Sequence, residues 1–125
     1  MKIYPILRYH DARAAIDWLG EAFGFTEKDV HAGDGDTIVH AELNLPGGGV
    51  VMLSSEPKGG DQRWGERAGK GWLYAATEDV DALYERAVAA GAEVVMEPTD
   101  TDYGSRDFSV RDPEGNDWSF GTYGP

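Results

Sequence analysis

Two residues in the middle of the chain, His40 and Glu42, have the types and the spacing of a general acid–base pair. They lie two positions apart in residues 38–45, whose alternation is typical of a β-strand, so both side chains are expected on one face. A carboxylate beside an imidazole can exchange a proton near neutral pH. The alternative is a solvated or hydrogen-bonded polar pair near a dimer boundary. We favour it because no nucleophile or metal ligand is identifiable beside the pair.

A second group of polar and aromatic residues lies near the end of the chain, in the stretch RDPEGNDWSFGTY at residues 111–123. The pattern is typical of two strands joined by a tight turn. By strand alternation, Trp118 and Phe120 are expected in the core. The opposite face, which we expect to look into a cavity, would carry Asp117, Ser119 and Tyr123.

Length and composition exclude several classes of function. The chain has 125 residues, no cysteine and a net charge of -12, which suits a single domain without disulfides or thiolate chemistry. The negative charge repels phosphate backbones, so no nucleic-acid partner is expected. No apolar run approaches the roughly 20 residues of a membrane span. The first residues lead into a strand pattern rather than a signal peptide, so we expect a cytoplasmic protein with no membrane partner.

The elements that must position these residues form two similar series. Each series has a strand, a helix and three further strands. The helices are expected to begin after Asp11 and Asp79 and to end at Gly24 and Gly91. The two starts are 68 residues apart and the two ends are 67 residues apart. We call this separation of 67–68 residues the repeat offset. The expected strands are 2–9, 25–32, 38–45 and 49–54 in the first series, and 71–77, 93–99, 105–111 and 117–123 in the second.

The repeat offset predicts an internal duplication of a β-α-β-β-β unit. We expect one domain, with a first module at about residues 1–56, a linker at about 57–70 and a second module at about 71–125. Neither unit can bury its sheet alone, so the two must share a core or pair with a second chain. The linker carries Trp64, which we expect to cover a cavity or to dock across an interface.

The duplicated unit resembles the vicinal oxygen chelate superfamily, which contains glyoxalase I, extradiol dioxygenases, and fosfomycin and bleomycin resistance proteins. The resemblance is carried by EAFGF (21–25), AAGAEV (89–94) and RDPEGNDWSF (111–120), and it covers essentially the whole chain. It implies an α+β fold in which two modules form curved, cup-like mixed sheets around a ligand cavity, paired across a homodimer. The superfamily uses one scaffold for many chemistries.

In the metal-dependent members of that superfamily, four side chains from the first and last strand of each unit hold a divalent ion. The resemblance places Tyr4, Met52, Trp72 and Ser119 at these positions. A thioether, an indole and a neutral hydroxyl do not supply the oxygen or imidazole donors that such an ion needs. We therefore expect no metal and no cofactor. The chain is most similar to the metal-free, bleomycin-resistance-type binding proteins.

Strand alternation and this resemblance together give a set of expected ligand-binding residues. They are Tyr4, Ile6, Arg8, His40, Glu42, Met52, Trp64, Trp72, Tyr74, Tyr103, Asp117, Ser119 and Tyr123. The other sheet faces, which two helices would cover, carry Leu7, Val51, Leu53, Leu73, Ala75, Trp118 and Phe120. In residues 38–45, we expect Val39, Ala41, Leu43 and Leu45 on the covered side, and Ile38, His40, Glu42 and Asn44 toward the cup.

The resemblance to the bleomycin-resistance type implies a dimeric, metal-independent protein that sequesters an antitumour-type antibiotic and confers resistance without modifying it. A bleomycin-like glycopeptide would fit the acidic charge. A large aromatic polyketide or enediyne would fit the aromatic wall that Tyr4, Trp72 and Tyr74 are expected to form. An alternative is a lyase or isomerase of the same fold that uses His40 and Glu42 or a metal bound elsewhere. A third possibility is a binding protein for an ordinary metabolite.

Overall fold

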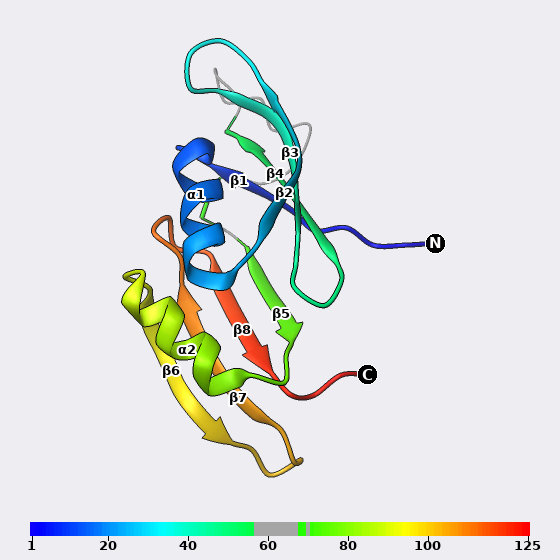
Figure 1. The fold of residues 1–125 in the computed structure, drawn as a ribbon, viewed down its shortest axis with the longest axis vertical. Coiled ribbons are helices and arrows are strands. Elements are labelled where there is room, and N and C mark those ends of the chain that lie inside the picture. The colour runs from blue at the N-terminus through cyan, green and yellow to red at the C-terminus, as the bar shows by residue number, and fades with distance from the viewer. Residues whose placement is uncertain (57–67, 70) are drawn as a thin grey trace.

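The computed structural model describes residues 1–56, 68–69 and 71–125, and it contains two modules of the same design (Figure 1). Module 1 consists of β1 (Ile6–Tyr9), α1 (Ala12–Phe23), β2 (Thr26–Ala32), β3 (Ile38–Asn44) and β4 (Val50–Ser55). Module 2 consists of β5 (Trp72–Ala76), α2 (Val80–Ala89), β6 (Glu93–Asp100), β7 (Arg106–Arg111) and β8 (Asp117–Gly121). The predicted α+β class and order of elements are confirmed. Trp64 lies outside the described residues.

Each module forms a four-stranded mixed sheet in which the first and last strands are parallel neighbours. The strand orders are β1-β4-β3-β2 and β5-β8-β7-β6. Met52 lies between Ile6 and Glu42 in the first sheet. Ser119 lies between Tyr74 and Ser109 in the second. These two rows occupy equivalent places in the sheets, so the duplication read from the sequence extends to the strand register.

The two modules share an aromatic core. Phe23, at the end of α1, packs against Trp118 and Phe120 of β8, with ring centroids 5.4 and 4.8 Å apart. Phe25 also contacts Trp118, at 5.5 Å. Trp118 and Phe120 are buried, as their alternation predicted. We expected the two units either to share a core or to pair with a second chain. The structure has the shared core.

Each helix also caps the end of the other. The indole Nε1 of Trp18 on α1 donates to the carbonyl oxygen of Ala90, just after α2, at 2.8 Å. Arg86 on α2 donates from Nε to Glu21 O at 2.7 Å and from Nη2 to Gly20 O at 3.0 Å, near the end of α1. These bonds satisfy carbonyls that a helix C-terminus leaves without a partner. Trp18 and Arg86 are separated by the repeat offset, so they have equivalent places in the two modules.

The turn after β7 fastens the two modules together through two carboxylates. Asp112 is buried and accepts hydrogen bonds from Tyr9 Oη at 2.6 Å and from Trp118 Nε1 at 3.1 Å. Burial and the Asp112 carboxylate together raise the pKa of Tyr9 far above its ordinary value. Glu114 accepts from His10 N at 2.6 Å and from Asp11 N at 2.9 Å. The turn therefore holds the junction between β1 and α1.

Two expectations about strands are wrong. The first strand begins at Ile6 rather than at residue 2. In β3, Ile38 is buried and Val39 is 63% exposed, the reverse of the prediction. His31 pairs with His40 whereas Ala32 pairs with Ile38, so Val39 is an extra residue in β3. Such a bulge reverses the alternation of side chains beyond it.

No described helix is long and apolar enough to cross a membrane.

Candidate functional site

The sheet faces opposite the buried core carry most of the predicted ligand-binding residues. We call them the open faces. Figure 1 shows both helices along the same side of the molecule. On the open face of module 1 lie Ile6, Arg8, His40, Glu42 and Met52. On the open face of module 2 lie Trp72, Tyr74, Ser109, Asp117 and Ser119.

The open face of module 1 is polar and charged on β3. His40 Nε2 and Glu42 Oε2 are 2.9 Å apart, so the two residues form the hydrogen-bonded pair that their spacing allowed. Lys28 Nζ lies 3.7 Å from Glu42 Oε1. The hydrogen bond from His40 is the largest cause of a lowered Glu42 pKa, and the Lys28 charge also lowers it. The pair can therefore accept hydrogen bonds or contact a cationic group.

A second imidazole–carboxylate pair lies next to this one and was not predicted. His31 Nε2 is 3.0 Å from Asp29 Oδ2, and the rings of His31 and His40 stack with centroids 6.3 Å apart. The His31 side chain is exposed, and its position beside His40 follows from the β2–β3 register. Within residues 1–56, 68–69 and 71–125, no three His, Asp or Glu side chains are arranged to hold a metal ion.

The open face of module 2 is aromatic. Trp72 is 78% exposed and Tyr74 is 44% exposed, although both lie in a β-strand. The indole Nε1 of Trp72 donates to Ser119 Oγ at 3.2 Å, and Ser119 Oγ is 2.8 Å from Ser109 Oγ. Tyr74 Oη donates to the carbonyl oxygen of Tyr123 at 2.7 Å. The predicted aromatic wall is therefore held in place by hydroxyls and a backbone carbonyl.

In this chain, the residues at the four positions that hold a divalent ion in metal-dependent members do not form a divalent-ion site. Trp72 and Ser119 are hydrogen-bonded to each other through an indole N–H, which is a donor and cannot ligate a cation. Met52 offers only a soft thioether. Tyr4 precedes β1 and is 47% exposed. The donor set that a hard or borderline divalent ion requires is therefore not supplied by these residues.

A buried carboxylate supports the tyrosines beside this wall. Asp107 accepts from Tyr103 Oη at 2.9 Å and from Ser105 Oγ. The hydrogen bond to Asp107 raises the pKa of Tyr103. Burial, followed by the Asp107 charge, raises the pKa of Tyr74. A Cβ at Gly121 would overlap the Asp107 carboxylate, so only glycine fits opposite it.

Asp107 and Ser109 were missed by sequence reasoning. The signal that could have found them is the duplication, because they follow His40 and Glu42 by the repeat offset. Asp117 lies on the open face but is engaged by Arg111, whose Nε donates to Asp117 Oδ1 at 3.0 Å. A cavity of about 600 Å³ brings Tyr4 and Tyr74 together at the seam between the modules.

The chain matches known proteins over nearly its whole length. A family model described as Glyoxalase/Bleomycin resistance protein/Dioxygenase superfamily matches residues 4–120. TioX from Micromonospora sp. ML1 has a similar structure, with a TM-score of 0.76 and 34% identity over 96% of this chain and 98% of that one. An uncharacterised protein of Mycobacterium bovis, Mb0911c, is 34% identical over 94% of this chain and 80% of its own length.

A more distant structure shows the same fold. The glyoxalase/bleomycin resistance protein/dioxygenase family enzyme from Burkholderia phytofirmans PsJN has a TM-score of 0.72 at 23% identity, with 94% of each chain covered. The family match, the duplicated modules and the two mixed sheets agree with one another. The chain therefore belongs to the glyoxalase/bleomycin resistance protein/dioxygenase superfamily.

Proposed function

We propose that this protein sequesters an antitumour-type antibiotic in the cytoplasm and confers resistance without modifying the drug. The observation that carries the proposal is the open face of module 2. There Trp72 and Tyr74 present aromatic surface that no described residue covers. Aromatic faces of this kind bind flat, conjugated molecules by stacking. A large aromatic polyketide or an enediyne has that shape.

Charge supports a second ligand chemistry at the same face. The chain carries a net charge of -12, and the Glu42 carboxylate is partly exposed on the open face of module 1. A negative field attracts cationic ligands and raises their local concentration. A bleomycin-like glycopeptide carries positive charge and an extended aromatic portion. It would therefore place its cation toward module 1 and its rings toward module 2.

A second copy of the chain would complete the cavity. Each open face is one side of a sheet, and the exposed apolar residues Ile6, Trp72 and Tyr74 are spread over two modules. Exposed apolar surface of this kind marks an interaction site, and a two-fold partner is the commonest way to cover it. We therefore propose a homodimer. Sedimentation should give about twice the chain mass of 13.6 kDa.

The positions of the superfamily's metal ligands support binding rather than metal-assisted chemistry. Met52, Trp72 and Ser119 supply contact surface and hydrogen bonds, but not a divalent-ion site. The proposed ligand-binding residues remain those named from the sequence, including Trp64. Asp107 joins them as a support for Tyr103 and Tyr74.

Recovery of the drug tests the proposal directly. The purified protein would be incubated with bleomycin and, separately, with the aromatic polyketide daunorubicin. Tryptophan fluorescence would report binding, and mass spectrometry would report the state of the drug after denaturation of the complex. Saturable quenching with the drug recovered intact is expected. Elemental analysis of the same protein, purified without chelators, should show no stoichiometric divalent metal.

A second candidate function rests on the 2.9 Å contact between His40 and Glu42. An imidazole hydrogen-bonded to a carboxylate can act as a general base in a lyase or an isomerase. Conversion of a bound compound, lost in both H40A and E42Q, would favour this enzyme over the sequestering protein. Binding of neither drug, together with tight binding of a common metabolite, would favour an ordinary binding protein.

A further inference from the structure

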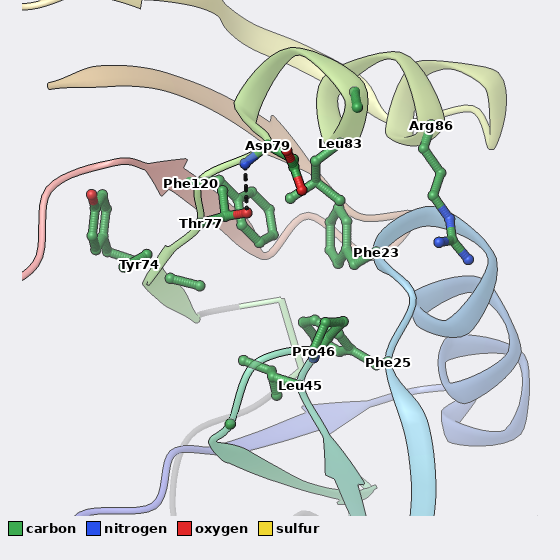
Figure 2. A pocket seen from close by; sticks show the side chains of 14 residues that line it. Phe23, Phe25, Leu45, Pro46, Tyr74, Thr77, Asp79, Leu83, Arg86 and Phe120 are labelled. Atoms are coloured by element: carbon green, nitrogen blue, oxygen red, sulfur yellow. Dashed lines mark hydrogen bonds between the residues drawn. The ribbon is translucent and has the colours of Figure 1, made fainter.

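We propose a second ligand site, apart from the open faces, that takes a small aromatic carboxylic acid. The site is a cavity of about 500 Å³ between the two modules, a size typical of small-molecule pockets. Figure 2 shows the rings of Phe23, Phe25 and Phe120 on its walls, with Leu45 and Pro46 opposite the start of α2. Among those ligand-binding residues proposed above that the structure describes, only Tyr74 also lines it.

Because the two modules are duplicates, the region around this cavity has an equivalent region elsewhere in the molecule. In the turn after β7, Asp112 N donates to Asn116 O and Gly115 N donates to Asp112 O, both at 3.0 Å. In the turn after β3, Leu45 N donates to Gly49 O and Gly48 N donates to Leu45 O, at 3.0 and 3.1 Å. The two turns are thus the same structure, separated by the repeat offset.

Each turn lies next to the strand–helix junction of the other module. The turn after β7 contacts Tyr9, His10 and Asp11 before α1. The turn after β3 lines a cavity with Thr77 and Asp79, which precede α2 and follow Tyr9 and Asp11 by the repeat offset. The two regions can therefore be compared position by position.

The first region is filled by the chain's own side chains. Tyr9, Trp18 and Glu114 line what remains of it, a space of about 50 Å³. At the equivalent positions of the second region stand Thr77, Arg86 and Gly47. A phenol ring, an indole ring and a carboxylate are thus replaced by a small hydroxyl, a guanidinium that turns toward the end of α1, and no side chain. This loss of volume leaves the larger cavity.

The missing carboxylate leaves backbone donors without a charged acceptor. In the filled region, Glu114 accepts from the N–H groups of His10 and Asp11. In the open region, the Glu78 N–H has no acceptor among the described residues, and Asp79 N reaches only Thr77 Oγ1 at 3.3 Å (Figure 2). A ligand carboxylate in the place of Glu114 would accept from both.

The chemistry of the ligand follows from what the open region lacks. An aromatic ring would take the volume that Tyr9 and Trp18 fill in the other copy, against Phe23 and Phe120. A carboxylate would take the place of Glu114, with the Arg86 charge on the same wall. In the filled copy the Asp11 carboxylate accepts from Ala14 N while Asp11 N donates to Glu114. The Asp79 carboxylate, which also lines the cavity, would therefore turn in the same way toward the start of α2 when the anion binds.

Titration of the whole protein with 2-naphthoate, followed by calorimetry, tests the site. One naphthoate per chain is expected, bound at least tenfold more tightly than 2-naphthylmethylammonium, which has the same rings and the opposite charge. T77Y, which restores the tyrosine of the filled copy, and A82F, at an exposed position of α2 that lines the cavity, should each weaken binding at least tenfold. A89F, at an exposed position of the same helix outside the cavity, should leave it unchanged.

The open faces provide the remaining control. W72A should leave naphthoate affinity unchanged, and A82F should leave antibiotic binding unchanged, so the two sites can fail independently. Unchanged naphthoate affinity in T77Y and A82F, both folded by thermal melt, would overturn the proposal. So would equal affinity for the amine, or loss of naphthoate binding in W72A, which would place the acid at the open face.

Discussion

The open faces of the two modules have the same strand register and opposite surface chemistry. In module 1, Met52 lies between Ile6 and Glu42. In module 2, Ser119 lies between Tyr74 and Ser109. The register is fixed by the buried residues of each sheet, because a slip of one position would turn the apolar side chains to solvent. The open-face residues carry no such constraint, so one half could become charged and the other aromatic.

The largest contrast between the modules lies in their turns. Replacement of Asp112 by alanine would leave the Tyr9 hydroxyl and the Trp118 indole N–H buried without an acceptor. We expect a loss of about 3–5 kcal/mol in the free energy of unfolding, measured in urea. The same substitution at the equivalent, half-buried Leu45 should cost only about 1 kcal/mol. Equal losses would show that the two turns contribute alike to stability, and that the turn after β7 does not fasten the modules more strongly than the turn after β3.

The aromatic half of the open surface should dominate ligand binding. W72A is expected to weaken antibiotic binding by about 1–3 kcal/mol and to keep the fold, because the Trp72 side chain is largely exposed. Most of the fluorescence quenching should vanish with it. Truncation of Tyr4, which precedes Trp72 by the repeat offset, should have a smaller effect. If the melting temperature of W72A fell as far as that of a Trp118→Ala variant, in which a buried side chain is removed, Trp72 would instead belong to a core.

Asp107 affects the titration of two tyrosines in module 2, whereas its counterpart in module 1, His40, lies beside Glu42. The hydrogen bond to Asp107 raises the pKa of Tyr103, and burial followed by the Asp107 charge raises the pKa of Tyr74, so D107N should lower both toward the ordinary value of 10. A raised tyrosine pKa stabilises the fold below pH 10, and this contribution is lost as the pH rises through the folded-state pKa. Tyrosinate absorbance in alkaline titrations of D107N, with Y103F to assign the signal, measures the change. Unaltered titration would remove Asp107 from this role.

The smallest expected effect concerns the charged half. His40 lowers the pKa of Glu42 by hydrogen bonding, so H40A should raise that pKa toward its ordinary value. A lowered carboxyl pKa stabilises the fold above the unfolded-state pKa, and this contribution is lost as the pH falls through the folded-state value. Carbon-detected NMR of the Glu42 carboxyl group gives the titration directly. The hydrogen bond would be ruled out in solution by identical curves in both proteins.

Sequence patterns correctly predicted the features that depend on interactions between residues close together in the chain. The capping residue Asp11, the left-handed Gly24 and the alternation around Trp118 each act within a few residues, and the structure bears them out. The reversed sides of Ile38 and Val39 depend on a bulge that only the β2 partner reveals. Asp79 has the same type and place as Asp11 but makes no capping bond with its side chain.

The parts of the site that were missed depend on contacts between distant segments. The turn within residues 111–123 was predicted from its sequence only as a tight connection between two strands. Its carboxylates Asp112 and Glu114 bind Tyr9, His10 and Asp11, which are about 100 positions away in the sequence. Asp107 was missed because its partners Tyr103 and Ser105 lie in a loop without periodicity. A repeat alignment would have indicated its face but not its bonds.

The bond between Tyr9 and Asp112 also sets an order of events during synthesis. The two residues are 103 positions apart, so at roughly 5–20 residues per second they are made about 5–20 s apart. Throughout that interval the Tyr9 hydroxyl must remain hydrated, and Phe23 lacks the β8 rings against which it packs. Because β8 also lies between β5 and β7, the nascent chain exposes apolar surface until β8 has been made.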